Sequence, residues 1–93
     1  MAVSYARSGQ ITVTTAGTEV AGPDVPGSTF AIKAHPDNTD TVWVGNVGGG
    51  VVASTTGFPL NPGQSVPIDI TNLSLLMFDA DVNGEKICWL RVS

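Results

Sequence analysis

The chain has 93 residues, of which 42% are hydrophobic and only 13% are charged, and its net charge at pH 7 is −4. A chain of this length is expected to form one small domain with a thin core, and its low charge predicts that another protein covers part of the surface. Its four basic residues are dispersed, so we expect no direct binding to nucleic acid. The sequence shows no signal peptide pattern and no apolar run near the roughly 20 residues of a membrane span, so we expect synthesis in a cytoplasm and no membrane binding.

The first half of the chain predicts β-strands and no helix. Val, Thr, Ile and Gly dominate, and apolar residues recur at every second position rather than at helical spacing. Residues 1–9 are expected to form an N-terminal arm, and a strand follows at 10–16. A short return strand at 20–21 and a loop at 22–27, which is rich in Pro and Gly, precede another strand at 28–34.

The second half continues this pattern. A polar turn at 35–40 leads into a strand at 41–47, and the glycines at 48–50 predict a tip. The nearly continuous apolar run at 73–78 is typical of a strand covered on both faces, and a last strand is expected at 85–92. About six to eight short antiparallel strands with regular turns predict an all-β fold, either a small single-domain β-sandwich or a jelly-roll-like barrel, over the whole chain.

The stretch 57–70 is expected to form the central corner of this fold. Asn61-Pro62-Gly63 predicts a tight turn, because proline fixes φ and glycine reaches positive φ. Phe58 and Leu60 lie two residues apart before the turn, and apolar residues alternate in the same way after it. We therefore expect Phe58 and Leu60 to point the same way and to be buried, either in the core or at a seam between subunits.

The strongest candidate for a metal site follows the apolar run. Asp79, Asp81 and Asn83, followed by Gly84, match the first half of a calcium-binding loop. The glutamate that completes such a loop would fall at Leu90, and strands rather than helices are expected on both sides. Asn-Gly between two strands is also a strong hairpin signal. We therefore expect a β-hairpin here and no metal or other cofactor, with a weak cation site as the alternative.

Four other side chains complete the candidate residues. Trp43 and Trp89 are expected to be core or interface anchors, with a sugar-binding platform as the alternative. Cys88 has no second cysteine to pair with and is expected to be a small core residue, whereas His35 is expected in a solvated loop. No arrangement of residues indicates a catalytic site, so we do not expect an enzyme.

Four segments of the second half occur in an order that is familiar from a known group of proteins. They are Thr41-Val42-Trp43-Val44-Gly45, Gly57-Phe58-Pro59-Leu60-Asn61-Pro62-Gly63-Gln64-Ser65-Val66, Leu76-Met77-Phe78-Asp79-Ala80 and Cys88-Trp89-Leu90. Through them, residues 28–92 resemble small all-β virion proteins of tailed bacteriophages. The resemblance implies a capsid decoration (cement) protein that binds the major capsid protein on the outer head surface as a homotrimer and stabilises the shell. The alternative is a head-fibre or tail-associated module that binds a receptor or glycan.

Overall fold

Eight β-strands and one short 3-10 helix make up the part of the chain that the computed structural model describes, which is residues 7–46 and 57–93. In chain order these elements are β1 (Arg7–Val13), β2 (Val20–Ala21), β3 (Thr29–Ala34), β4 (Val42–Asn46), β5 (Phe58–Leu60), β6 (Ser65–Asp69), η1 (Leu73–Leu75), β7 (Leu76–Ala80) and β8 (Glu85–Arg91). The prediction of an all-β fold with six to eight strands is confirmed. Within the described residues, no helix has the length and hydropathy needed to cross a membrane.

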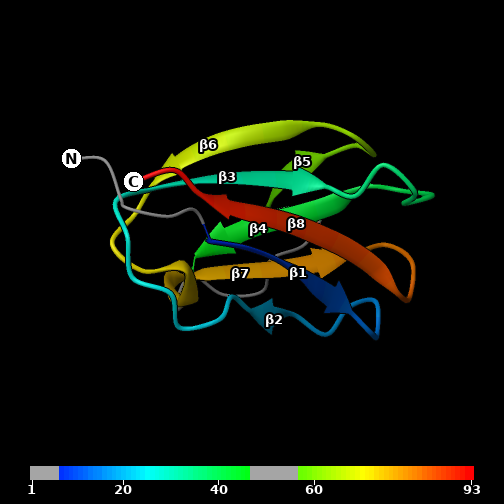
Figure 1. Cartoon of the computed structure of the whole chain (residues 1–93). Helices are drawn as coiled ribbons and strands as arrows, with labels where there is room; N and C mark the ends of the chain where they lie inside the picture. Colours follow the sequence, from blue (N-terminus) through cyan, green and yellow to red (C-terminus); the bar gives the residue numbers. More distant parts are fainter. Residues whose placement is uncertain (1–6, 47–56) are drawn as a thin grey trace.

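The strands form two four-stranded antiparallel sheets that lie face to face (Figure 1). The order in the first sheet, sheet A, is β1-β8-β3-β6, and the order in the second, sheet B, is β2-β7-β4-β5. Most consecutive strands therefore alternate between the two sheets, so the chain crosses the sandwich repeatedly. This strand order is that of a jelly roll, which combines the two predicted alternatives in a single architecture.

The core lies between the sheets and is built by strict alternation along the strands. Phe30 and Ile32 of β3 are fully buried, as their spacing predicts, and Val42 and Val44 of β4 face them from the other sheet. Gly9 of β1 is required by this packing, since a Cβ atom there would lie 2.9 Å from the Trp89 indole. The buried apolar side chains are Ile11, Val13, Val25, Phe30, Ile32, Ala34, Val42, Val44, Leu60, Leu73, Leu76, Phe78, Ala80, Ile87 and Trp89.

The predicted central corner is confirmed as a passage from one sheet to the other. β5 belongs to sheet B and β6 to sheet A, and the turn between them lies at 61–63. Gly63 has a φ of 84°, and the backbone N–H of Gln64 donates to the carbonyl of Asn61 at 2.9 Å. The N–H of Gly63 also donates to the carbonyl of Ala34 at 3.0 Å, which fastens the turn to the end of β3. This corner is therefore a fixed part of the fold.

The structure changes the bounds of three predicted elements. Residues 7–9, expected in the N-terminal arm, belong to β1 and pair with β8. β2 does not return along β1 but pairs with β7 in the other sheet. The apolar run at 73–78 is divided into η1 and the start of β7, because the side chain of Asn72 caps the 3-10 turn. Residues 1–6 of the expected arm and the expected glycine tip at 48–50 lie outside the described residues.

Candidate functional site

Phe58 and Leu60 lie on the same face of β5 but differ in burial. They pair with Val44 and Val42 of β4, so both side chains project toward the interior of the sandwich. Leu60 is only 2% exposed, whereas Phe58 is 57% exposed and is the most exposed large apolar side chain among the described residues. The core position expected for Leu60 is confirmed. Phe58 does not lie in the core, and its alternative position at a seam between subunits stays a prediction. Phe58 is exposed because β5 is an edge strand of only three residues and Phe58 is the first of them.

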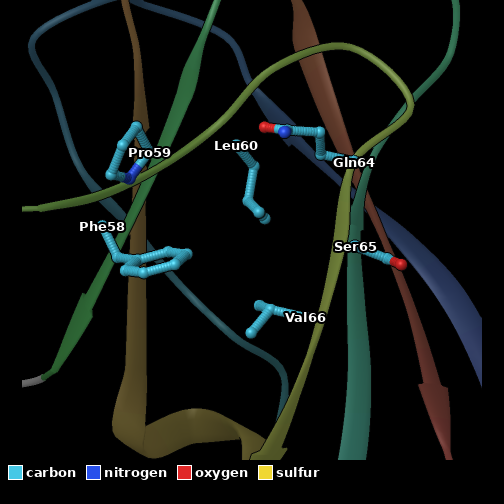
Figure 2. A pocket seen from close by; sticks show the side chains of 6 residues that line it. All are labelled: Phe58, Pro59, Leu60, Gln64, Ser65 and Val66. Carbon is cyan, nitrogen blue, oxygen red and sulfur yellow. The ribbon is translucent and has the colours of Figure 1, made fainter.

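Phe58 borders an apolar groove where the two sheets separate along their β5 and β6 edges. Figure 2 shows the Phe58 ring and the Val66 side chain projecting toward each other from these two strands. The larger hollow of this groove has a volume of about 280 Å³, and its lining contains no charged side chain. The lining residues, which define the β5–β6 groove, are Val44, Gly45, Phe58, Val66, Ile68 and Leu76. A second hollow of about 240 Å³ continues from it toward Gln64 and Ser65 in the corner.

A proline occupies the middle of each edge strand beside the groove. Pro59 lies opposite Trp43 in sheet B, and Pro67 lies opposite Ala31 in sheet A. A proline has no N–H to donate, so neither edge presents the row of donors that an added β-strand requires. The groove is therefore suited to receive apolar side chains of a partner and not an additional strand.

The two tryptophans have different environments. Trp89 lies in the core with 7% of its surface exposed, which confirms the core alternative for this residue. Trp43 alternates with the buried Val42 and Val44, so it lies on the outer face of sheet B and is not a core residue. Its Nε1 donates a hydrogen bond to Oδ1 of Asp81 at 3.0 Å, which fixes the half-buried indole against the sheet. An interface role for Trp43 stays a prediction.

The three residues of the possible calcium loop each have a different hydrogen-bond partner. Oδ1 of Asp79 accepts from the backbone N–H of Gly17 at 2.9 Å, and Oδ1 of Asn83 accepts from that of Ala16 at 2.7 Å. Asp81 accepts from the Trp43 indole instead. Among the residues that the structure describes, no group of three His, Cys, Asp or Glu side chains is placed to hold a metal ion. The chemistry of these side chains is therefore to fasten the β1–β2 loop and the indole to sheet B.

The predicted β-hairpin at this position is wrong. β7 and β8 belong to different sheets, so the turn that contains Gly84 crosses the sandwich and does not join paired strands. Gly84 has a φ of 83°, and its N–H donates to the carbonyl of Val13 at 2.8 Å. The local Asn-Gly turn was predicted correctly, but it is hydrogen-bonded to the end of β1 and not closed between two paired strands.

Glu85 has a structural role that was not predicted from the sequence. Its side chain is 5% exposed, and Oε1 accepts from the backbone N–H groups of Thr39 at 2.9 Å and Asp40 at 2.8 Å and from the Thr39 hydroxyl at 3.1 Å. A buried carboxylate with three donors fixes the β3–β4 loop against β8. Alternation in the sequence puts Glu85 on the same face of the strand as Ile87 and Trp89, so the core position expected for Trp89 was the signal for an inward-facing Glu85.

Two further predicted residues lie outside the core. Cys88 was expected to be buried, but it is half-buried on the outer face of sheet A, because it alternates with the inward-facing Ile87 and Trp89. His35 lies in the β3–β4 loop, as expected, and its Nδ1 accepts from the backbone N–H of Asp37 at 3.0 Å.

Comparison with known proteins adds little to this geometry. No family model matches the chain, and no curated protein matches it. Among solved structures, the fold is similar to a chain from the work "Bacillus endospore appendages form a novel family of disulfide-linked pili", with 15% sequence identity and a TM-score of 0.46. The likeness covers 96% of this chain and 88% of that chain. At this identity and score it supports no inference about function.

Proposed function

We propose that this protein is a non-enzymatic structural protein of a bacteriophage particle, which binds the outer surface of the capsid as a decoration protein. The observation that supports this proposal is Phe58, an exposed aromatic ring held by a proline-stiffened corner at the mouth of the apolar β5–β6 groove. Exposed apolar surface of this kind marks protein–protein contacts. Aromatic side chains next to hollows are also the usual anchors of binding energy in such contacts.

The mechanism of a decoration protein requires a rigid body rather than a reactive site. The buried polar side chains of Asp79 and Glu85 are occupied by hydrogen bonds that hold loops in place. A folded brace of this type would insert Phe58 at a seam of the shell and accept a side chain of the major capsid protein in the β5–β6 groove. Shell expansion or rupture would then have to break these contacts as well.

The second candidate is a head-fibre or tail-associated module that binds a glycan or receptor. It is favoured by one observation, the Trp43 indole on the outer face of sheet B with Asp81 beside it. An aromatic ring next to a polar group is a common platform for sugars. The two candidates place the binding surface on different sides of the molecule and therefore respond to different substitutions.

The test compares phage particles that carry Phe58→Ser, Trp43→Ala or no copy of this protein. For a decoration protein, we expect wild-type protein to purify with heads in many copies, Phe58→Ser protein to be lost from them, and undecorated heads to rupture at lower temperature. Trp43→Ala particles should adsorb to host cells normally. Loss of adsorption with Trp43→Ala, together with recovery of wild-type protein only in tail fractions, would support the second candidate. Normal thermal stability of particles that lack the protein would refute the decoration role.

A further inference from the structure

The charges of this chain are divided unequally between its two sheets. All four basic residues lie in strands of sheet A, namely Arg7 in β1, Lys33 in β3, and Lys86 and Arg91 in β8. The strands of sheet B contain no basic residue. Asp79 and Asp81 lie in and directly after β7, on the side of sheet B. Sheet A also contains two acidic residues, the buried Glu85 of β8 and the exposed Asp69 of the edge strand β6. Its strands therefore keep an excess of basic residues, whereas Asp79 is the charged residue in the strands of sheet B.

The outer face of sheet A combines an apolar centre with two lysines. We call this surface the lysine face and define it by Ala31, Lys33, Lys86, Cys88 and Leu90. These residues alternate with buried ones along β3 and β8, so their side chains point away from the core. Leu90 lies opposite Ala31, and Cys88 lies opposite Lys33, so the apolar residues and a lysine are neighbours across the sheet. Leu90 is 42% exposed, which leaves apolar surface open at the centre.

The outer face of sheet B combines an apolar centre with an acid. We call this surface the tryptophan face and define it by Trp43, Gly45, Pro59, Met77 and Asp81. Trp43 lies opposite Pro59, and Gly45 lies opposite Met77, so these four form one continuous patch. The exposed Asp81 borders the patch and is held there by the hydrogen bond from the Trp43 indole. A cation placed here would meet the Asp81 carboxylate with the Trp43 indole beside it.

From this charge complementarity we propose that the lysine face of one copy binds the tryptophan face of the next copy. Lys33 and Lys86 lie over Asp81 and the Trp43 ring, and Leu90 packs against the apolar part of the patch. The contact is heterologous, because the two surfaces lie on opposite sides of one molecule, and it repeats from copy to copy. Such a contact forms a closed ring where the rotation between copies closes and an open filament where it does not. This inference concerns self-association and is independent of the capsid role proposed above.

A heterologous contact joins two different surfaces, so a charge reversal on one surface of one variant can be compensated by the opposite reversal on the other surface of a second variant. The experiment tests this compensation. One variant carries Lys33→Glu and Lys86→Glu, and the other carries Asp81→Lys. Each variant alone places like charges across the contact, which raises the dissociation constant of self-association on the order of 100-fold. In an equimolar mixture, the reversed lysine face of the first variant meets the reversed tryptophan face of the second. Sedimentation velocity should therefore show monomers for each variant alone and association in the mixture.

The matched control is Asp37→Lys, which makes the same charge change at an exposed loop residue outside the tryptophan face. It should associate like the wild type. In a mixture with the lysine-reversed variant, it should bind only through that variant's intact tryptophan face, because its own tryptophan face carries no lysine that could pair with the introduced glutamates. Circular dichroism verifies that each variant is folded, and Asp81→Asn replaces Asp81→Lys if the latter is not. The asparagine variant should then associate more weakly than the wild type.

Three results would overturn the proposal. They are a wild-type protein that stays monomeric at all concentrations, single variants that associate as tightly as the wild type, and a mixture of variants that associates no better than its components. If another acidic protein, and not a second copy, occupies the lysine face, the wild type alone will be monomeric, which is the first of these results.

Discussion

Replacing Phe58 by alanine is expected to cost much less stability than replacing Leu60, although the two residues share one strand and one face. Phe58 is 57% exposed, so less than half of its surface is removed from water. A fully buried phenylalanine covers about 200 Å², which at roughly 25 cal/mol per Å² limits the loss to about 2 kcal/mol. Alanine retains part of that contact, so we expect a decrease in the free energy of unfolding of about 1–2 kcal/mol.

Leu60→Ala is the matched comparison. Leu60 is 2% exposed and sits among Val42 and other core residues, so its truncation leaves a cavity and should cost about 2–5 kcal/mol. A domain of this length has a total stability of about 5–14 kcal/mol, so Leu60→Ala could remove a large share of it. The Phe58 variant should remain folded, which makes it suitable for binding experiments.

The assay is equilibrium unfolding in urea, followed by circular dichroism at low protein concentration. The slope of the transition should be the same for both variants, because each exposes a similar total surface on unfolding. A larger loss for Phe58→Ala than for Leu60→Ala would refute the reasoning. It would mean that the Phe58 ring is covered in solution, either by another segment of this chain or by a second copy.

Three further outcomes are expected. Glu85→Ala should lower the free energy of unfolding by about 2–3 kcal/mol in the same urea assay, because it removes the charged acceptor of the Thr39 and Asp40 backbone N–H groups. Glu85→Gln should cost less. Gly9→Ala should lower the free energy of unfolding by about 1–3 kcal/mol and alter the near-ultraviolet circular dichroism of Trp89, because the new Cβ would lie 2.9 Å from the indole. An unchanged spectrum and stability would contradict this packing. Excess chelator should leave the melting temperature unchanged, because Asp79 already accepts from a backbone N–H, and a fall of several degrees would indicate a bound cation.

The sequence allowed the strands and the corner to be predicted, because both depend on local chemistry. Alternation places Phe30 and Ile32 on one face of a strand, and the structure buries that face. Asn61-Pro62-Gly63 identified the turn. The same alternation predicted equal burial for Phe58 and Leu60, although only Leu60 lies in the core. Both lie on the edge strand β5, but Leu60 is next to the corner that joins the two sheets, whereas Phe58 lies where the groove opens. This arrangement depends on long-range pairing and not on the residues of β5.

Long-range pairing also explains the other errors. Asn83-Gly84 has the local signature of a hairpin, but the strands on either side enter different sheets. Alternation divided β8 into two faces correctly, yet it does not state which face meets the core, so Cys88 was assigned to the wrong side. The tryptophan face could not be predicted at all, because Trp43 and Asp81 come together only when β4 pairs with β7.

The pairing of β1 with β8 has a consequence for biosynthesis. Arg7 lies opposite Arg91, so β1 finds its place in sheet A only after β8 has left the ribosome. Contacts of such large sequence separation are slow to form, typically in milliseconds to seconds for β-proteins. Until then the apolar side of β1, with Ile11 and Val13, has no sheet to cover it. A nascent chain of this protein is therefore exposed to aggregation and chaperone capture until β8 has emerged from the ribosome and paired with β1.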